Sequence, residues 1–352
     1  MKKRILITGL LGQDGANMAE LLLKDSDNLV FGMIRRSSSP NFINCKNILN
    51  DPNFNLVYGD LTDEISISNL VQEIQPDYFI NFAANSFVGC SWDMPLHVFD
   101  TNTNGVIRCL EAIKKFQPKC RFYSAGSSEE FGDVEFTPQD LTHPLKPRSP
   151  YGASKCAARH IVKVYRESYG LYAIHGLLFN HEGTKRGEEF VTRKISKGVA
   201  RIKKELDFYF ESGHQSSAPS PIELGYLDSK RDWSDSEDFM RGIWLMLNQD
   251  EPKEYLLASG ETHSIREFVE KAFEVVGIEG KWSGEGEGEK FILSSHKEQI
   301  LVKINPKYYR PAEVNLLLGD PTEAKEKLGW QPKICFDKLV EKMVTWDLHE
   351  TS

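Results

Sequence analysis

Tyr151 and Lys155 are the two residues of this sequence whose types and spacing most directly suggest chemistry. Residues four apart lie on one face of a helix, and Pro150, just before the tyrosine, is of the type favoured at a helix start. An ammonium beside a phenol favours the phenolate, so we expect Lys155 to lower the pKa of Tyr151 toward that of a useful general base. A surface pair without chemistry is the alternative, because this spacing is common.

A second set of reactive side chains lies upstream, in the run SAGSSEEFG at residues 124–132. The Ser127 hydroxyl could bond a substrate oxygen, which is all that a sugar epimerisation needs here. The Glu129 carboxylate could also remove a proton from a carbon next to a carbonyl and return it to a departing hydroxyl. Dehydration after oxidation requires this chemistry. The alternative is that Glu129 and Glu130 are solvated acids in a loop.

A glycine-rich turn near the N-terminus predicts a site for a dinucleotide. The run GLLGQDG at residues 9–15 has the spacing GxxGxxG, follows an apolar strand and opens a helix pattern. Glycines permit a tight turn and a close backbone approach, and the helix N-terminus offers unpaired amides and a positive dipole end to a pyrophosphate. The candidate cofactor residues of this turn are Gly9, Gly12, Gln13, Asp14 and Gly15.

The end of the second predicted strand indicates which dinucleotide binds. An acid is expected there for NAD, because a carboxylate accepts the ribose hydroxyls and repels an added phosphate. This sequence has Arg35, Arg36 and Ser37 instead, and such groups suit a 2′-phosphate, so we predict NADP. Asp60, followed by Leu61 at the end of the third predicted strand, is placed to meet the adenine, with a turn or helix-capping role as the alternative.

An alternation of strands and helices places these side chains. Short apolar runs are separated by turns and helix-patterned stretches, which predicts a parallel sheet with right-handed crossovers and helices on both faces. The fold class is therefore α/β, a doubly wound parallel sheet with a smaller, interleaved α/β domain, and the site should lie along the C-terminal strand ends. The predicted strands are residues 4–8, 29–34, 78–82 and 121–124, with a third strand ending at 57–60 and a first helix at 16–24.

The remainder of the chain predicts a second, interleaved domain. Beyond Phe179 the pattern loosens, and the polar run at residues 212–221 predicts an exposed loop. Residues 235–247 have a helix pattern and residues 255–258 a strand pattern, so this piece could rejoin the first domain. The cofactor domain would comprise residues 1–178 plus about 222–258, and the substrate domain residues about 179–221 plus 259–352.

The composition is that of a globular protein and excludes several classes of function. The chain has 352 residues, 40% of them hydrophobic, and a formal net charge of −8 with both signs mixed. We expect no nucleic-acid partner, and any anionic ligand must be held by a few placed Arg and Lys residues and by backbone amides. We also expect no membrane partner, since no apolar run is long enough, and no metal site. Six scattered cysteines and the lack of a signal-peptide pattern predict a cytoplasmic protein.

Four further runs match one protein family. They are FNHEGTKRGEEFVTRK from Phe179, LDSKRDW from Leu227, HSIREFVEK from His263 and YYRPAEVNLLLGDPTEAKEKLGW from Tyr308. With the motifs above, they make the chain resemble the GDP-mannose 4,6-dehydratase family, a branch of the extended short-chain dehydrogenases/reductases, over nearly its whole length. The resemblance implies a Rossmann domain, bound NADP and a GDP-linked sugar as substrate.

The resemblance also implies a reaction. Tyr151 would take the proton of the sugar 4-hydroxyl while a hydride passes from carbon 4 to NADP, and Lys155 would hold the nicotinamide ribose. Glu129 would then remove the carbon-5 proton, and Ser127 and Glu129 would assist loss of the 6-hydroxyl as water. Return of the hydride to carbon 6 would give a 4-keto-6-deoxy sugar nucleotide, so the enzyme would be a hydro-lyase.

Further binding residues and an assembly follow from the same resemblance. A homodimer or homotetramer is implied, with the loop from Arg35 near a neighbouring subunit. The additional residues implied to contact NADP are Ala83, Ala84, Ser86, Tyr151, Lys155, His181 and Arg186. Those implied to contact the GDP-sugar are Ser86, Ser127, Glu129, Asn180, Lys194, Arg231, Arg310 and Glu313.

Departures from the family pattern keep other functions open. Ser127 stands where the family usually has threonine, which keeps the hydroxyl. The segment at 203–221 is longer than its family counterpart and carries Phe208, Tyr209 and Phe210, so it could lie near the sugar. A GDP-manno-heptose dehydratase or another sugar-nucleotide-modifying enzyme is therefore an alternative. From a different class, a non-catalytic NADP-binding protein is a further alternative.

Overall fold

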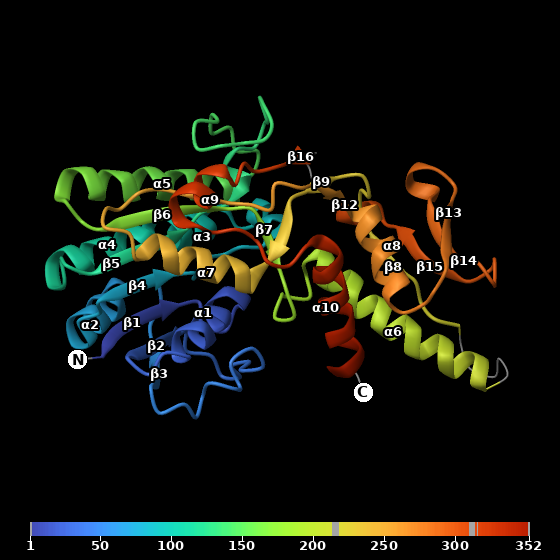
Figure 1. Ribbon diagram of the computed structural model, residues 1–352, viewed down its shortest axis with the longest axis horizontal. Helices are drawn as coiled ribbons and strands as arrows, with labels where there is room; N and C mark the ends of the chain where they lie inside the picture. Colours follow the sequence, from blue (N-terminus) through green and yellow to red (C-terminus); the bar gives the residue numbers. More distant parts are fainter. Residues whose placement is uncertain (1, 213–217, 310–313, 315, 351–352) are drawn as a thin grey trace.

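The computed structural model describes residues 2–212, 218–309, 314 and 316–350. Figure 1 shows two parts: a large sheet with helices on both faces, at the left, and a smaller group of short strands and helices at the right. Across these described ranges, no helix is both long and apolar enough to cross a membrane.

The large sheet has seven strands in the order β11-β6-β5-β4-β1-β2-β3, and every neighbouring pair is parallel. From β1 the chain first adds β2 and β3 on one side, then returns to add β4, β5 and β6 on the other. Sheets of this kind bind ligands at the carboxyl ends of the strands, where the order reverses. The strands are β1 (Lys3–Thr8), β2 (Asn28–Ile34), β3 (Phe54–Tyr58), β4 (Tyr78–Asn81), β5 (Arg121–Ala125), β6 (Ala173–Leu178) and β11 (Leu256–Leu257).

The sheet is covered on both faces because apolar side chains occupy successive strand positions. In β1, Ile5 and Ile7 lie in the core beneath α1 and α7, whereas Leu6 lies in the core beneath α2, α4 and α5. All three side chains are fully buried. The surrounding helices and short turns are α1 (Gln13–Leu23), α2 (Glu64–Ile74), η1 (Val88–Trp92), α3 (Pro95–Phe99), η2 (Asp100–Asn104), α4 (Gly105–Phe116), η3 (Ser128–Glu130), α5 (Pro150–Tyr169), α7 (Ser236–Leu247) and α9 (Thr322–Leu328).

The smaller part has a hydrophobic core of its own. Helices α6, α8 and α10 pack with a four-stranded sheet of order β13-β14-β15-β8, and Trp233 stacks on Phe336 inside this core. Its elements are β7 (Asn180–Glu182), α6 (Val191–Glu211), β8 (Ile222–Leu224), β9 (Lys230–Arg231), β10 (Trp233–Asp235), β12 (His263–Ser264), α8 (Ile265–Val275), β13 (Gly280–Ser283), η4 (Gly286–Gly288), β14 (Lys290–Leu293), β15 (Ile300–Ile304), η5 (Pro306–Tyr308), β16 (Leu316–Leu317) and α10 (Phe336–Glu350).

The doubly wound fold predicted from the sequence is confirmed, and each predicted strand is present in the large sheet. Helix α1 begins at Gln13, three residues before the predicted start at residue 16. The apolar pattern missed this first turn because it carries the polar residues Gln13 and Asp14. The helix predicted at 235–247 is α7, and the strand predicted at 255–258 contains β11.

The described residues of the segment at 203–221 lie in the C-terminal half of α6 and just before β8. This helix has 21 residues and is therefore about 30 Å long, and Figure 1 shows its C-terminal end beyond the smaller part, away from the large sheet. There the Phe210 ring lies 5.0 Å from the His296 ring, and Gln299 donates to the Pro219 carbonyl at 3.0 Å. Residues 213–217 lie outside the described residues. The described residues do not support a position near the sugar, because the helix carries them away from the strand ends.

The predicted division into two interleaved domains stays a prediction. Ile222 and Leu224 of β8 pack in the core of the smaller part. The two later elements α7 and β11 pack with the large sheet.

Candidate active site

Side-chain hydrogen bonds join the C-terminal ends of β1 and β4. The Thr8 hydroxyl donates to Asn81 Oδ1 at 2.5 Å and accepts from the Ala83 amide at 3.1 Å. These bonds hold the segment after β4, which carries Ala84 and the exposed Ser86, beside the glycine turn after β1. Two segments predicted to contact the cofactor therefore lie at one edge of the sheet.

The backbone packs so closely around the glycine turn that there is no room for a side chain at Gly9 or Gly15. Gly9 has φ +71°, and a Cβ built there would lie 2.8 Å from the Ala83 amide nitrogen. A Cβ on Gly15 would lie 2.4 Å from the Gly9 carbonyl oxygen. Gly12 is the N-cap of α1, so no cap side chain competes with a ligand for the amides of the first turn. This cradle fits the pyrophosphate of a dinucleotide.

The basic residues after β2 fit the phosphate that distinguishes NADP. Arg35, Arg36 and Ser37 directly follow β2, and all three are exposed. Two guanidinium groups and a hydroxyl can hold a dianion at this position. The parallel pairing of β1 with β2 places them at the same edge of the sheet as the glycine turn.

Asp60 has a role in the turn that follows β3. Its Oδ1 accepts hydrogen bonds from the amide and the hydroxyl of Thr62, at 2.9 and 2.8 Å. This is the turn role that the sequence left open as an alternative. Leu61 is buried against Gly105. Contact of Asp60 or Leu61 with the adenine stays a prediction.

Asp14 and His181 form an ion pair beside the glycine turn. His181 Nε2 lies 3.0 Å from Asp14 Oδ2, its Nδ1 donates to the Phe179 carbonyl at 2.8 Å, and Gln13 donates to the His181 carbonyl at 3.0 Å. Burial opposes charge on both groups, but their mutual attraction and hydrogen bond raise the pKa of His181 and lower that of Asp14. The pair therefore fixes β7 against the start of α1.

Arg186 adds a positive charge near the Asp14–His181 pair. It forms an ion pair with the buried Glu182 at 3.0 Å, and its guanidinium carbon lies 3.5 Å from the centroid of the Phe190 ring. Glu182 also accepts from the Thr192 hydroxyl at 2.5 Å. These contacts hold a positive group near the N-terminus of α6.

Three of the residues predicted to bind the GDP-sugar lie in the smaller part: Asn180, Lys194 and Arg231. Asn180 lies on β7, and its Oδ1 is buried with no hydrogen-bond partner among the described residues. Lys194 lies on α6, with its Nζ 3.5 Å from the centroid of the Tyr308 ring, and the buried Arg231 lies on β9. Arg310 and Glu313 lie outside the described residues.

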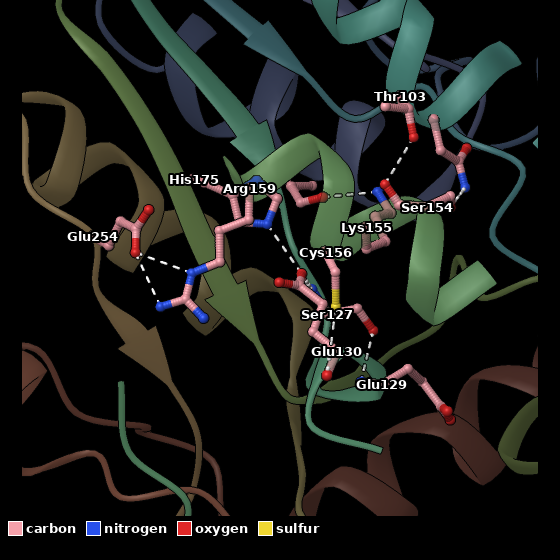
Figure 2. Close-up of polar contacts among 12 residues, drawn as sticks. Thr103, Ser127, Glu129, Glu130, Ser154, Lys155, Cys156, Arg159, His175 and Glu254 are labelled. Atoms are coloured by element: carbon pink, nitrogen blue, oxygen red, sulfur yellow. Dashed lines mark hydrogen bonds and ion pairs between the residues drawn. The ribbon is translucent and has the colours of Figure 1, made fainter. Parts of the chain in front are cut away.

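Tyr151 and Lys155 lie on the first turns of α5, as their spacing predicted. The Ser149 hydroxyl accepts from the Gly152 amide at 3.0 Å and so caps the helix one residue before Pro150. Only 8% of Tyr151 and 6% of Lys155 is exposed, which excludes the surface-pair alternative. Figure 2 shows the hydrogen bond from Lys155 Nζ to the Ala125 carbonyl, 2.7 Å long.

The predicted lowering of the Tyr151 pKa is wrong for the protein chain considered alone. Burial raises the pKa of the phenol, and the hydrogen bond with Ser127 lowers it by less. The Lys155 ammonium is directed to the Ala125 carbonyl and lies 5.8 Å from the centroid of the Tyr151 ring. Burial also lowers the pKa of Lys155 to about 8. Desolvation therefore outweighs the charge effect that the spacing suggested.

Glu129 lies on η3, the short turn that follows β5, and Ser127 is the N-cap residue of η3. The Ser127 hydroxyl accepts from the Glu129 amide at 3.3 Å, and Glu130 accepts from the Ser127 amide at 2.8 Å, which together form a capping box. Glu129 is partly exposed, whereas Glu130 is fully buried. Figure 2 shows the Glu129 side chain pointing away from Glu130. The solvated-loop alternative is therefore wrong for Glu130.

The sequence analysis missed a buried polar network beneath α5. Asn102 donates to the Ser154 hydroxyl at 3.0 Å and accepts from the Asn85 amide at 2.8 Å, and Ser154 donates to the Tyr151 carbonyl at 2.7 Å. The network joins the segment after β4 to α5. Its signal was the run TNTNG at 101–105, where an asparagine unsuited to a helix interior lies in a π-helical turn, a feature frequent at functional sites.

The described part of the chain holds no group of three or more His, Cys, Asp or Glu side chains that could bind a metal ion. All six cysteines are free. The groups that the structure brings to the strand ends are the Tyr151 phenol, the Lys155 amine, the Ser127 hydroxyl and the Glu129 carboxylate.

Comparisons with known proteins place this geometry in a family. A family model described as GDP-mannose 4,6 dehydratase matches residues 6–343. The chain is 42% identical to a GDP-mannose 4,6-dehydratase of Yersinia enterocolitica, with 99% of this chain and 94% of that protein covered. It is also 42% identical to a human GDP-mannose 4,6 dehydratase, with 97% and 91% covered.

Solved structures agree with the fold. The crystal structure of UDP-glucose 4-epimerase from Thermotoga maritima has a TM-score of 0.80 at 20% identity and covers 99% of this chain and 100% of its own. That of dTDP-glucose 4,6-dehydratase from Bacillus anthracis has a TM-score of 0.77 at 21% identity, with 99% and 97% covered. At such identities the likeness shows the Rossmann-type fold alone.

Proposed function

We propose that this chain, which belongs to the GDP-mannose 4,6-dehydratase family, converts GDP-mannose to GDP-4-keto-6-deoxymannose and water with a bound NADP. The observation that carries the proposal is the arrangement at the end of β5. There a partly exposed carboxylate, Glu129, follows a hydroxyl, Ser127, which opposes the effect of burial on the pKa of the buried Tyr151.

The first half of the reaction is an oxidation at carbon 4 of the sugar. NADP held at the glycine turn would supply a reversible hydride acceptor, so the hydride taken from carbon 4 would return to carbon 6 and no external reductant would be consumed. Tyr151 takes the proton of the 4-hydroxyl, and Ser127 hydrogen-bonds the same oxygen. Lys155 holds the nicotinamide ribose from the next turn of α5. A bound, oxidised nicotinamide would add positive charge, which would oppose the effect of burial on the Tyr151 pKa.

The second half is the loss of water between carbons 5 and 6. The new 4-keto group acidifies the carbon-5 proton, which Glu129 removes as general base. Glu129 then donates this proton to the departing 6-hydroxyl, and water leaves. The resulting enone would take the hydride back at carbon 6 and a proton from solvent at carbon 5, while Tyr151 releases to solvent the proton that it took from the 4-hydroxyl, so the protons balance. The sugar has then lost one water and gained no net electrons.

The nucleotide part of the substrate is held by the smaller part of the molecule. Lys194 and Arg231 supply positive charge for the diphosphate in a protein whose net charge is −8. Asn180 offers a buried amide, and Arg310 and Glu313 complete the proposed set. Ser86, exposed after β4, contacts both ligands in this proposal.

The proposed protein is a cytoplasmic homodimer or homotetramer. The free state of all six cysteines supports a reducing compartment. Exposed apolar side chains on α3 and α5, which pack together, support self-association. They include Leu96, 87% exposed, and Val164 and Tyr169, about half exposed.

The test is incubation of the purified protein with GDP-mannose, without added cofactor, and detection of the nucleotide product by mass. Loss of one water is expected. If only a GDP-manno-heptose lost water, the family would stand and the substrate would be wrong. If neither sugar changed even with NADP supplied, the non-catalytic alternative would replace this proposal.

Replacing Glu129 with Gln removes the proposed base and keeps the shape of the side chain. We expect kcat for water loss to fall by about 10²- to 10⁴-fold, the usual contribution of a general base, with NADP binding retained. Glu135→Gln is the matched control, since Glu135 is an exposed acid later in the same loop. Unchanged turnover in Glu129→Gln would refute the assigned role.

A further inference from the structure

Glu130 and His175 form a fully buried pair of ionisable groups next to the proposed catalytic residues. Glu130 lies on η3 and His175 on β6, and both side chains are 0% exposed. His175 Nε2 lies 3.0 Å from Glu130 Oε1, as the dashed line in Figure 2 shows. Burying such a pair costs free energy, so its position needs a physical explanation.

The same carboxylate oxygen also holds the backbone of Ser127. Glu130 Oε1 accepts from the Ser127 amide at 2.8 Å, and the Ser127 hydroxyl in turn accepts from the Glu129 amide at 3.3 Å. On the other side of Ser127, a Cβ on Gly126 would lie 2.5 Å from His175 Nε2. The buried pair therefore contacts the chain immediately before and at Ser127.

The buried Glu130 carboxylate depends on its contact with His175 to stay ionised. Burial would raise the pKa of Glu130, but His175 and the Ser127 amide outweigh it, so the pKa is lowered and the carboxylate is ionised. Within the described residues, Glu130 Oε2 and His175 Nδ1 have no hydrogen-bond partner. Without His175, the buried carboxylate would keep the Ser127 amide as its one hydrogen-bond donor there, which would not compensate its charge.

We propose that Glu130 and His175 are positioning residues for dehydration, which fix the Ser127 amide and thereby aim the Ser127 hydroxyl and the Glu129 carboxylate at the sugar. Neither touches the substrate. The proposal rests on the proposed function. Its physical basis is that catalysis by oriented groups is sensitive to small displacements, with about 1 Å costing up to about 100-fold in rate.

The test compares Glu130→Leu, His175→Leu, the double variant and Glu130→Gln. We expect each single Leu variant to lower kcat by about tenfold or more, with KM and NADP affinity nearly unchanged. Glu130→Gln keeps an oxygen for the Ser127 amide, so its kcat should be close to that of the unchanged protein. The double variant removes the whole buried pair and should regain stability, since apolar replacement of a whole buried pair is often neutral, but its kcat should stay low.

Asp238→Leu is the matched control. Asp238 is also a fully buried carboxylate that accepts backbone amides, those of Lys333 and Ile334 at 2.7 and 3.1 Å. It lies on α7, and the amides that it accepts belong to the segment before α10. This variant should lose stability in thermal unfolding and keep the kcat of the unchanged protein.

Amide hydrogen exchange of the peptide covering residues 122–131 provides a readout that needs no substrate. Exchange should be faster in Glu130→Leu and His175→Leu, and near normal in Glu130→Gln. A double variant with normal kcat, or single Leu variants with unchanged exchange, would overturn the proposal. If the unchanged protein left GDP-mannose intact, the proposed function would fail, while exchange would still decide whether the pair holds the turn.

Discussion

The Asp14–His181 ion pair shows how one contact between distant residues can set a pH response. The raised pKa of His181 means that its charged form is stabilised by folding. This contribution is fully present below about pH 6.5, the ordinary histidine value, and is lost as the pH rises through the higher pKa of the folded protein. The lowered pKa of Asp14 keeps the carboxylate ionised throughout this range.

We therefore expect His181→Gln to remove a pH dependence from the free energy of unfolding. In the unchanged protein this free energy should fall above pH 6.5, by about 1.4 kcal/mol for each tenfold gain in proton affinity. Chemical denaturation at a series of pH values measures it. The exposed His160→Gln is the control and should keep the fall. An identical fall in His181→Gln would show that another group causes it.

The turn between β1 and α1 is a unit whose function depends on close approach. Gly15→Ala would bring a Cβ to 2.4 Å from the Gly9 carbonyl oxygen and 2.7 Å from the Leu10 Cα, so the helix start must move. Overpacking of this kind costs about 1–3 kcal/mol, which predicts roughly tenfold or more weaker NADP binding.

Calorimetric titration of NADP into nucleotide-free protein measures this loss. Gly288→Ala is the matched control, because nothing lies within 4 Å of a Cβ built there and no positive φ strains it. Equal affinities in the two variants would mean that the turn does not hold the cofactor.

The molecule as a unit presents apolar side chains that a monomer would leave in water. Leu96 on α3 and Val164 on α5 are 87% and 48% exposed, and the two helices are neighbours. Leu96→Glu with Val164→Glu should shift a dimer or tetramer toward the monomer, because burying a carboxylate in an apolar interface is costly. Light scattering during size-exclusion chromatography gives the mass. A protein that is monomeric before any change would refute the assembly.

Patterns in short stretches of sequence were enough to predict the order of strands and helices. They also predicted which edge of the sheet the reactive side chains occupy. Strand runs such as residues 4–8, the glycine turn at 9–15 and the Tyr151–Lys155 spacing are features of neighbouring residues. Parallel strands bring their carboxyl ends to one edge, so the doubly wound fold and the position of the helix that carries Tyr151 and Lys155 were predictable. The family resemblance added the reaction and the substrate class.

The contacts and the burial of each side chain depended on the tertiary structure. Glu129 and Glu130 are adjacent and of the same type, yet only Glu130 is fully buried. Its carboxylate is hydrogen-bonded to His175 on β6, which compensates its burial. Burial likewise raised the Tyr151 pKa, against the prediction from its spacing to Lys155. Sequence determined which groups are present and in what order along the fold. Desolvation and pairing depend on contacts between segments far apart in the chain, so the charge and direction of each group emerged only on folding.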